Sequence, residues 1–185
     1  SNSQIHEFFK DKDSEFVDIN NINAPKTLRR IRYYYPLQEK IGKKHGVLWA
    51  IQKLIMYGQI FFKVNRLKKT PNIKFGKGSQ WFSITDDFAR YILSKETELR
   101  KIFYMGQTVD ELFVQTVLLN SSFENRIGSS NLRFIKWKNK NSPEVLSGSA
   151  DLKEILASDD LFARKFDCRI DSKIVENILN KIKGF

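Results

Sequence analysis

The sequence predicts an α/β fold, because strand-like and helix-like patterns interleave along its 185 residues. Alternating polar and apolar residues predict strands, and apolar residues that recur every three to four positions predict helices. With 41% hydrophobic residues, including 15 Phe, the chain can bury a core of ordinary density, which excludes wholesale disorder. No internal repeat or Ser/Gly linker divides the sequence, so we expect a single domain over residues 1–185.

The N-terminal half contains predicted elements of both kinds. In order, they are a helix at 3–10, strands at 15–20 and 27–35, a helix at 47–62, and two short strands separated by glycines within 72–84. The strand at 27–35 is predicted because basic residues alternate with apolar or aromatic ones up to Pro36. The helix at 47–62 is predicted because its bulky apolar residues fall on one face.

The C-terminal half is richer in helix signals. In order, the predicted elements are a helix that begins at Thr85, a helix at 112–119, a loop at 121–131, a strand at 132–137, and helices at 151–156 and 171–182. Thr85 is a typical N-cap, and Asp86 and Asp87 place negative charge at the positive end of the helix dipole. Ile174, Ile178 and Ile182 form an apolar stripe that predicts a packing helix.

The net charge of +11 is concentrated in one part of the chain. Residues 26–77 carry 14 Lys and Arg against one acidic residue, whereas the rest of the chain is close to neutral. Such a segment is typical of a nucleic-acid-binding module, in which Arg29, Arg30 and Arg32 with the neighbouring tyrosines would contact phosphates and bases.

A second interpretation of the same charge is a basic amphipathic insertion at about 40–70. Residues 47–69 could dock on an anionic membrane surface, with aromatic side chains inserted and lysines at the headgroups. The pattern is equally compatible with a helix that packs on a sheet, because a basic amphipathic sequence does not discriminate between the two.

Metal chemistry is poorly supported by the sequence. Cys168 is the single cysteine, which excludes an intramolecular disulfide and a metal site with four thiolate ligands. The two histidines are far apart, which argues against a His-rich metal site. Asp11 and Asp13 have the spacing of a metal-binding DxD motif, but they lie in a polar run rather than after a buried strand. We therefore interpret them as a solvated turn.

The run Gly76-Lys77-Gly78-Ser79 lies at the break between two predicted strands. It is not a P-loop, because that motif requires a glycine four positions before Gly-Lys-Ser/Thr. Glycines beside a strand more often mark a bulge or a close backbone approach than a ligand contact.

Glu111 lies at the start of an apolar predicted helix, three residues after Thr108. This capping-box spacing favours a structural role. A carboxylate at that position could alternatively act as a general base toward a sugar hydroxyl.

Two further candidates lie at predicted strand ends. Trp137 is either a core residue or a ring that stacks on a sugar. Arg164 and Lys165, framed by phenylalanines, are either a surface pair or a clamp for a diphosphate.

Four segments, in this order along the chain, resemble the core-2/I-branching β-1,6-N-acetylglucosaminyltransferase family, which also contains peptide O-xylosyltransferases. The segments are KGSQWFSITDDFARYIL, TVDELFVQTVLLNS, LRFIKW and DLFARKFD. The resemblance implies the C-terminal part of a GT-A-like domain, with a mixed sheet flanked by helices and a nucleotide-binding half upstream.

The resemblance also implies an activity and site residues. The activity is inverting, metal-independent transfer of a sugar, most often N-acetylglucosamine or alternatively xylose, from a UDP-sugar to a glycan or polysaccharide. Glu111 matches the catalytic base, Trp137 an acceptor-contacting residue, and Gly78 and Ser79 a turn near the acceptor and donor.

Lys165 matches the basic residue that neutralises the UDP diphosphate, and Arg164 is a weaker candidate for the same role. Golgi members of the family are rich in cysteine, so the single cysteine suggests a bacterial relative. We expect such a protein to work in the cytoplasm, at the inner face of the membrane if residues 47–69 dock there.

Overall fold

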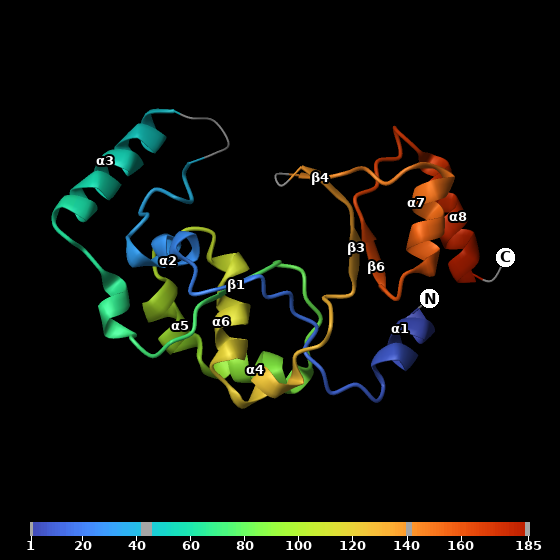
Figure 1. The fold of residues 1–185 in the computed structure, drawn as a ribbon, viewed down its shortest axis with the longest axis horizontal. Coiled ribbons are helices and arrows are strands. Elements are labelled where there is room, and N and C mark those ends of the chain that lie inside the picture. The colour runs from blue at the N-terminus through green and yellow to red at the C-terminus, as the bar shows by residue number, and fades with distance from the viewer. Residues whose placement is uncertain (1, 42–45, 140–141, 184–185) are drawn as a thin grey trace.

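Helices and short strands interleave along the chain, which confirms the mixed α/β class (Figure 1). The structure is a computed structural model that describes residues 2–41, 46–139 and 142–183. The α-helices are α1 (Asn2–Phe9), α2 (Pro25–Arg32), α3 (Val47–Phe61), α4 (Asp86–Ser94), α5 (Glu96–Phe103), α6 (Phe113–Leu119), α7 (Gly148–Ala157) and α8 (Ser172–Lys183). The 3₁₀ helices are η1 (Arg66–Lys69), η2 (Val109–Glu111) and η3 (Ser122–Arg126).

The strands pair two by two among the described residues. They are β1 (Asn21–Ile22), β2 (Gly76–Lys77), β3 (Arg133–Ile135), β4 (Trp137–Asn139), β5 (Ser142–Pro143) and β6 (Phe162–Arg164). β1 pairs with β2 and β4 with β5, both antiparallel, while β3 and β6 are parallel with Ile135 opposite Arg164. A GT-A-like arrangement with one larger mixed sheet stays a prediction.

The strand predicted at 27–35 is wrong, because these residues largely form helix α2. Pro25 occupies the first turn, where its missing N–H costs nothing and its φ suits a helix. Thr27 and Ile31 lie four residues apart and are both buried, so the segment has a helical face. The alternation of Arg and apolar residues covers too few positions to distinguish the two-residue period of a strand from the 3.6-residue period of a helix.

Two other strand predictions hold only in part. Residues 15–20 are extended, but they make single bridges, from Glu15 to Ile127 and from Phe16 to Ser83. Residues 132–137 divide at Lys136, so Trp137 begins β4 instead of ending a strand.

The core lies around α6. Val114 and Leu118 pack in one cluster with Phe88, and Leu112, just before the helix, packs in a second cluster with Phe103. All residues from 114 to 119 are buried. The segment immediately before α6 is therefore held firmly in place.

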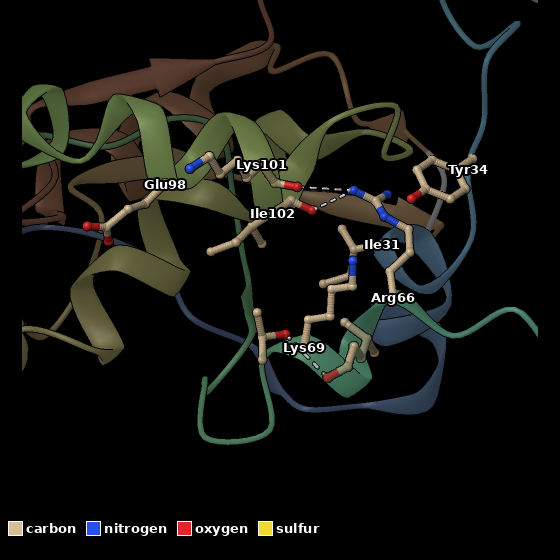
Figure 2. A pocket seen from close by; sticks show the side chains of 9 residues that line it. Ile31, Tyr34, Arg66, Lys69, Glu98, Lys101 and Ile102 are labelled. Carbon is tan, nitrogen blue, oxygen red and sulfur yellow. Dashed lines mark hydrogen bonds between the residues drawn. The ribbon is translucent and has the colours of Figure 1, made fainter.

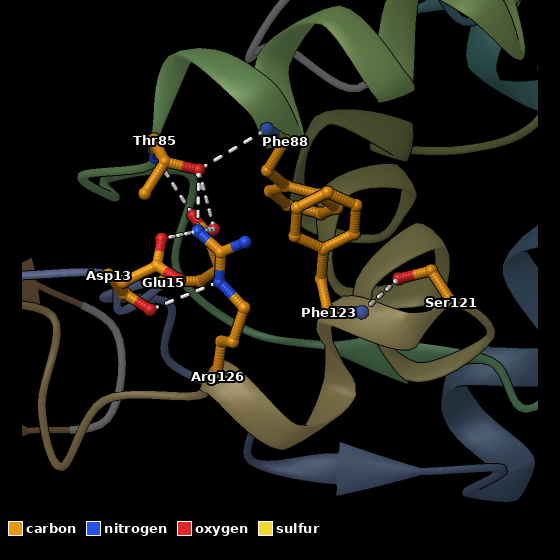
Figure 3. A network of polar contacts seen from close by, with 7 residues as sticks. All are labelled: Asp13, Glu15, Thr85, Phe88, Ser121, Phe123 and Arg126. Atoms are coloured by element: carbon orange, nitrogen blue, oxygen red, sulfur yellow. Dashed lines mark hydrogen bonds and ion pairs between the residues drawn. The ribbon is translucent and has the colours of Figure 1, made fainter.

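A polar network joins the N-terminal segment to α4 (Figure 3). The fully buried Glu15 accepts hydrogen bonds from the hydroxyl of Thr85 at 2.7 Å and from its backbone N–H at 2.9 Å. Thr85 also caps α4 by accepting from the N–H of Phe88, as the sequence predicts. Arg126 pairs with Asp13 and lies 3.5 Å from Glu15, so it offsets the buried carboxylate charge.

The helix predicted at 47–62 is confirmed as α3, at one end of the molecule (Figure 1). The alternative that it packs on a sheet as part of the core is wrong, because Gln52 is the one buried residue in α3. The predicted insertion at 40–70 also includes residues 42–45, which lie outside the described residues.

Candidate active site

A cavity of about 290 Å³ brings together five of the six predicted site residues. Its lining includes Gly78, Ser79, Glu111, Trp137 and Arg164. These residues come from the turn after β2, from η2, and from the strands β4 and β6. Residues that are far apart in the sequence thus surround one space.

Glu111 ends η2, and Leu112 alone separates it from helix α6. The capping-box interpretation is wrong: Thr108 has φ of 48°, in the left-handed region, and its side chain makes no capping hydrogen bond. The backbone instead fixes the position of Glu111, since its carbonyl oxygen accepts a hydrogen bond from the N–H of Gly78 at 3.0 Å. The carboxylate is left free for other partners.

Those partners are two cations. Glu111 Oε2 lies 2.7 Å from Arg30 Nη1 and 3.3 Å from Lys77 Nζ. Partial burial is the largest influence and raises the pKa of Glu111, but the hydrogen bonds and charges of Arg30 and Lys77 together lower that pKa below its ordinary value. At neutral pH the side chain is therefore a carboxylate, which is the form that accepts a proton.

The turn after β2 needs glycine because two backbone segments approach closely. A Cβ on Gly78 would lie 1.6 Å from the carbonyl oxygen of Asp18. The buried Gln115 of α6 donates a hydrogen bond to the carbonyl oxygen of Ser79 at 2.7 Å. The close approach expected for this glycine run is confirmed, and the same turn lines the cavity.

Two tryptophans lie at the cavity, and both are about half exposed. Trp137 is 57% exposed, so the interpretation as a core residue is wrong. Trp81, which the sequence analysis did not single out, is 47% exposed, and the guanidinium of Arg164 lies 5.1 Å from the centre of its ring. Exposed indole rings beside a polar cavity are suited to stack on the apolar faces of sugars.

Lys165 is the predicted site residue that does not line this cavity. It follows β6 directly and its side chain is exposed. Its backbone carbonyl oxygen accepts a hydrogen bond from the N–H of Leu146 at 2.8 Å. The structure therefore places Arg164, not Lys165, in the cavity wall.

Sequence reasoning missed the roles of Arg30 and Lys77. Lys77 belongs to the rejected P-loop motif and begins the first family-like segment, and Arg30 belongs to the basic segment, but no sequence pattern indicates their contact with Glu111. Of the arginines expected for nucleic-acid binding, Arg30 pairs with Glu111 and Arg29 contacts the sulfur of Met56, and that interpretation of the basic segment stays a prediction.

Asp11 and Asp13 follow α1 in an exposed turn, as predicted, and Asp13 pairs with Arg126. In the parts of the chain that the structure describes, no group of three or more His, Cys, Asp or Glu side chains could hold a metal ion.

Comparison with known proteins agrees with the resemblance of the motifs. A family model described as "Core-2/I-Branching enzyme" matches residues 1–157. The chain belongs to this family of glycosyltransferases. The family match includes Gly78, Ser79, Glu111 and Trp137, and it ends before Arg164 and Lys165.

Two curated relatives of this core-2/I-branching chain carry the name xylosyltransferase sqv-6. The protein of Caenorhabditis briggsae is 28% identical over 142 residues, which is 64% of this chain and 18% of the relative. The protein of Caenorhabditis elegans is 26% identical over 138 residues, which is 62% of this chain and 17% of the relative. The matched part of the chain thus covers less than a fifth of the length of either relative.

Proposed function

We propose that this chain carries the base and the acceptor side of an inverting glycosyltransferase that uses a UDP-sugar. The observation that carries the proposal is the position of Glu111. Its carboxylate lies in the wall of a cavity shared with Trp137 and Arg164 and is kept ionised by Arg30 and Lys77.

The proposed reaction is a single displacement at the anomeric carbon of the donor sugar. The acceptor oxygen forms a bond to that carbon while the bond to the UDP oxygen breaks. Glu111 Oε takes the proton of the acceptor hydroxyl, and UDP leaves with the electron pair of the broken bond. Inversion follows because the acceptor attacks from the face opposite the diphosphate.

The departing diphosphate needs positive charge. Arg164 in the cavity wall, with Lys165 beside it in the chain, supplies that charge in the proposal, with no metal ion required. Arg164 offers a planar fork, whereas the exposed side chain of Lys165 offers a mobile point charge.

Trp137 and Trp81 are proposed to hold the glycan acceptor. N-acetylglucosamine is the donor sugar that the motif resemblance implies. The names of the two relatives support xylose as the second candidate.

Transfer by the intact protein tests this proposal. We expect release of UDP and glycosylation of an oligosaccharide acceptor with UDP-N-acetylglucosamine or UDP-xylose, in the presence of EDTA. A protein that releases no UDP from either donor, with any glycan acceptor tried, would refute the proposal.

The diphosphate site is tested by calorimetry with UDP. Arg164→Ala and Lys165→Ala should each weaken UDP binding by about tenfold or more, since each removes a charge-assisted hydrogen bond. Lys181→Ala, an exposed lysine on α8, is the matched control and should leave the affinity unchanged. Unchanged affinity in Lys165→Ala alone would assign the role to Arg164.

A further inference from the structure

Helix α3 presents its apolar side to solvent. Val47 is 77% exposed, Leu54 72% and Phe61 80%. Ile51, Tyr57 and Phe62 extend this surface, and all three are exposed as well. We call these six residues the α3 face. A contiguous apolar surface of this kind indicates an interaction site.

On the side of α3 that faces the rest of the protein, two glutamines beside Trp49 and Met56 make hydrogen bonds. Gln52 is buried and accepts a hydrogen bond from the N–H of Leu37 at 3.0 Å. Gln59 donates to the carbonyl oxygen of Tyr34 at 2.9 Å and accepts from its N–H at 2.8 Å. These hydrogen bonds to residues 34–37 fix the orientation of α3, which leaves the α3 face exposed.

The segment after α3 is anchored by Arg66, which Figure 2 shows beside a second cavity. Its guanidinium lies 4.3 Å from the centre of the Tyr34 ring and donates to the carbonyl oxygen of Ile102 at 2.9 Å. Arg66 thus makes its contacts within the protein, whereas the neighbouring Lys63, Lys68 and Lys69 are exposed.

The charge of the sequence segment that contains α3 has one sign. Between Glu39 and Asp86 the sequence contains no acidic residue, and Lys53 is the single charged residue within α3. The ammonium of Lys53 lies over the ring of Trp49, 3.7 Å from its centre. Along the chain, exposed cations therefore follow an uncharged apolar face.

We propose that α3 lies in the plane of an anionic lipid surface, with the α3 face inserted below the headgroups and Lys63, Lys68 and Lys69 at the lipid phosphates. An interfacial helix needs an apolar face and cations at its margins, and both occur here together. A second copy of the chain would cover the apolar face but would bring two strongly basic segments together, which charge repulsion opposes. Nucleic acid would neutralise the lysines and leave the apolar face in water.

Among the described residues, none of the helices is long and apolar enough to cross a bilayer. The 15 residues of α3 correspond to about 22 Å at 1.5 Å per residue, shorter than the hydrocarbon thickness. The proposal is therefore attachment to one leaflet.

Sedimentation with vesicles tests the proposal. The intact protein should bind vesicles of phosphatidylcholine with 30% phosphatidylglycerol, and binding should weaken at least about tenfold on pure phosphatidylcholine. Lys68→Gln with Lys69→Gln should weaken binding to the anionic vesicles by about tenfold or more. Lys181→Gln with Lys183→Gln, which removes the same charge from α8, should not.

The apolar contribution needs its own variant. Leu54→Ser with Phe61→Ser should lower vesicle binding by at least about tenfold, because both side chains leave the hydrocarbon region. Leu93→Ser, at a residue of α4 that is 70% exposed, is the control. All four side chains replaced in the lysine pair and the apolar pair are exposed, and unchanged circular dichroism melts will show that each variant folds.

Insertion is distinguished from adsorption by Phe61→Trp with brominated lipids. Quenching that exceeds that of the unsubstituted protein, whose own tryptophans give the background, supports insertion. Absence of binding, or binding that Leu54→Ser with Phe61→Ser leaves unchanged, overturns the proposal. A dimer in sedimentation equilibrium that the same apolar variant dissociates, with no vesicle binding, would also overturn it and assign the face to a second copy.

Discussion

Glu111, the proposed base, is held by two cations that also weaken its affinity for a proton. Arg30 and Lys77 lower its pKa, so the carboxylate stays ionised at neutral pH but attracts the acceptor proton less strongly. The pair also fixes where the carboxylate lies, which favours a positioning role for Arg30.

Removal of Arg30 should therefore change the pH dependence of transfer. In the proposed mechanism, activity requires ionised Glu111 and falls as the pH drops through the pKa of this side chain. Arg30→Gln raises that pKa, so the acid limb of kcat/KM should move to higher pH, and kcat should fall by about tenfold or more as the carboxylate loses its position. Arg29→Gln, at the exposed neighbour, should leave the limb in place. An unmoved acid limb in Arg30→Gln would argue that Arg30 has a merely structural role.

Gly78 has no room for a side chain. Its Cβ would meet the carbonyl oxygen of Asp18, which is backbone and cannot move independently. Gly78→Ala should lower the free energy of unfolding by more than about 2 kcal/mol. Gly58→Ala, in α3 with nothing near its Cβ, should instead raise it by about 0.5–1 kcal/mol. Urea unfolding measures the free energy of unfolding of both variants. Equal values would show that the backbone at Asp18 moves to make room for the added Cβ.

At the scale of elements, the start of α4 depends on one hydroxyl. Thr85 caps the helix and donates to the buried Glu15 (Figure 3). Thr85→Ala should cost about 2–4 kcal/mol, because the cap is lost and a buried carboxylate loses a partner. Thr85→Ser keeps the hydroxyl and should cost less than about 1 kcal/mol. Equal melting temperatures for Thr85→Ala and Thr85→Ser would show that the hydroxyl does not account for the stability.

Elements with a strong local signal were predictable. The apolar repeat of α3 covers enough positions to fix a helical period, and Thr85 marks the start of α4 because a hydroxyl is a typical N-cap. The segment at 27–35 does not fix a period, because its alternation also fits a helix that starts at Pro25 and buries Thr27 and Ile31. The capping box predicted from the spacing of Thr108 and Glu111 is wrong for a related reason. Spacing contains no information about backbone angles, and Thr108 has a φ in the left-handed region.

At the scale of the whole molecule, the cavity forms where two parts of the chain meet. Figure 1 shows α2, α5 and α6 on one side and β3, β6, α7 and α8 on the other. The resemblance of four short segments was enough to select five of the residues that line the cavity. It could not select Arg30 and Lys77, because their contact with Glu111 exists only in three dimensions.

The same scale explains why the charge was ambiguous. The cations of the basic segment fall into two groups. Arg30 and Lys77 pair with Glu111, whereas Lys63, Lys68 and Lys69 are exposed and follow α3 in the chain. A charge count along the sequence cannot separate these two groups of cations, because it does not show which residues are in contact.

The most direct test of the central proposal is to measure transfer and UDP binding of Glu111→Gln in one preparation of the intact protein. The amide keeps the shape of the side chain but cannot accept the proton. We expect kcat to fall by about 100-fold to 10,000-fold, with the dissociation constant for UDP changed less than about threefold. Turnover close to that of the unsubstituted protein, with UDP bound equally well, would contradict the assignment of Glu111 as the base.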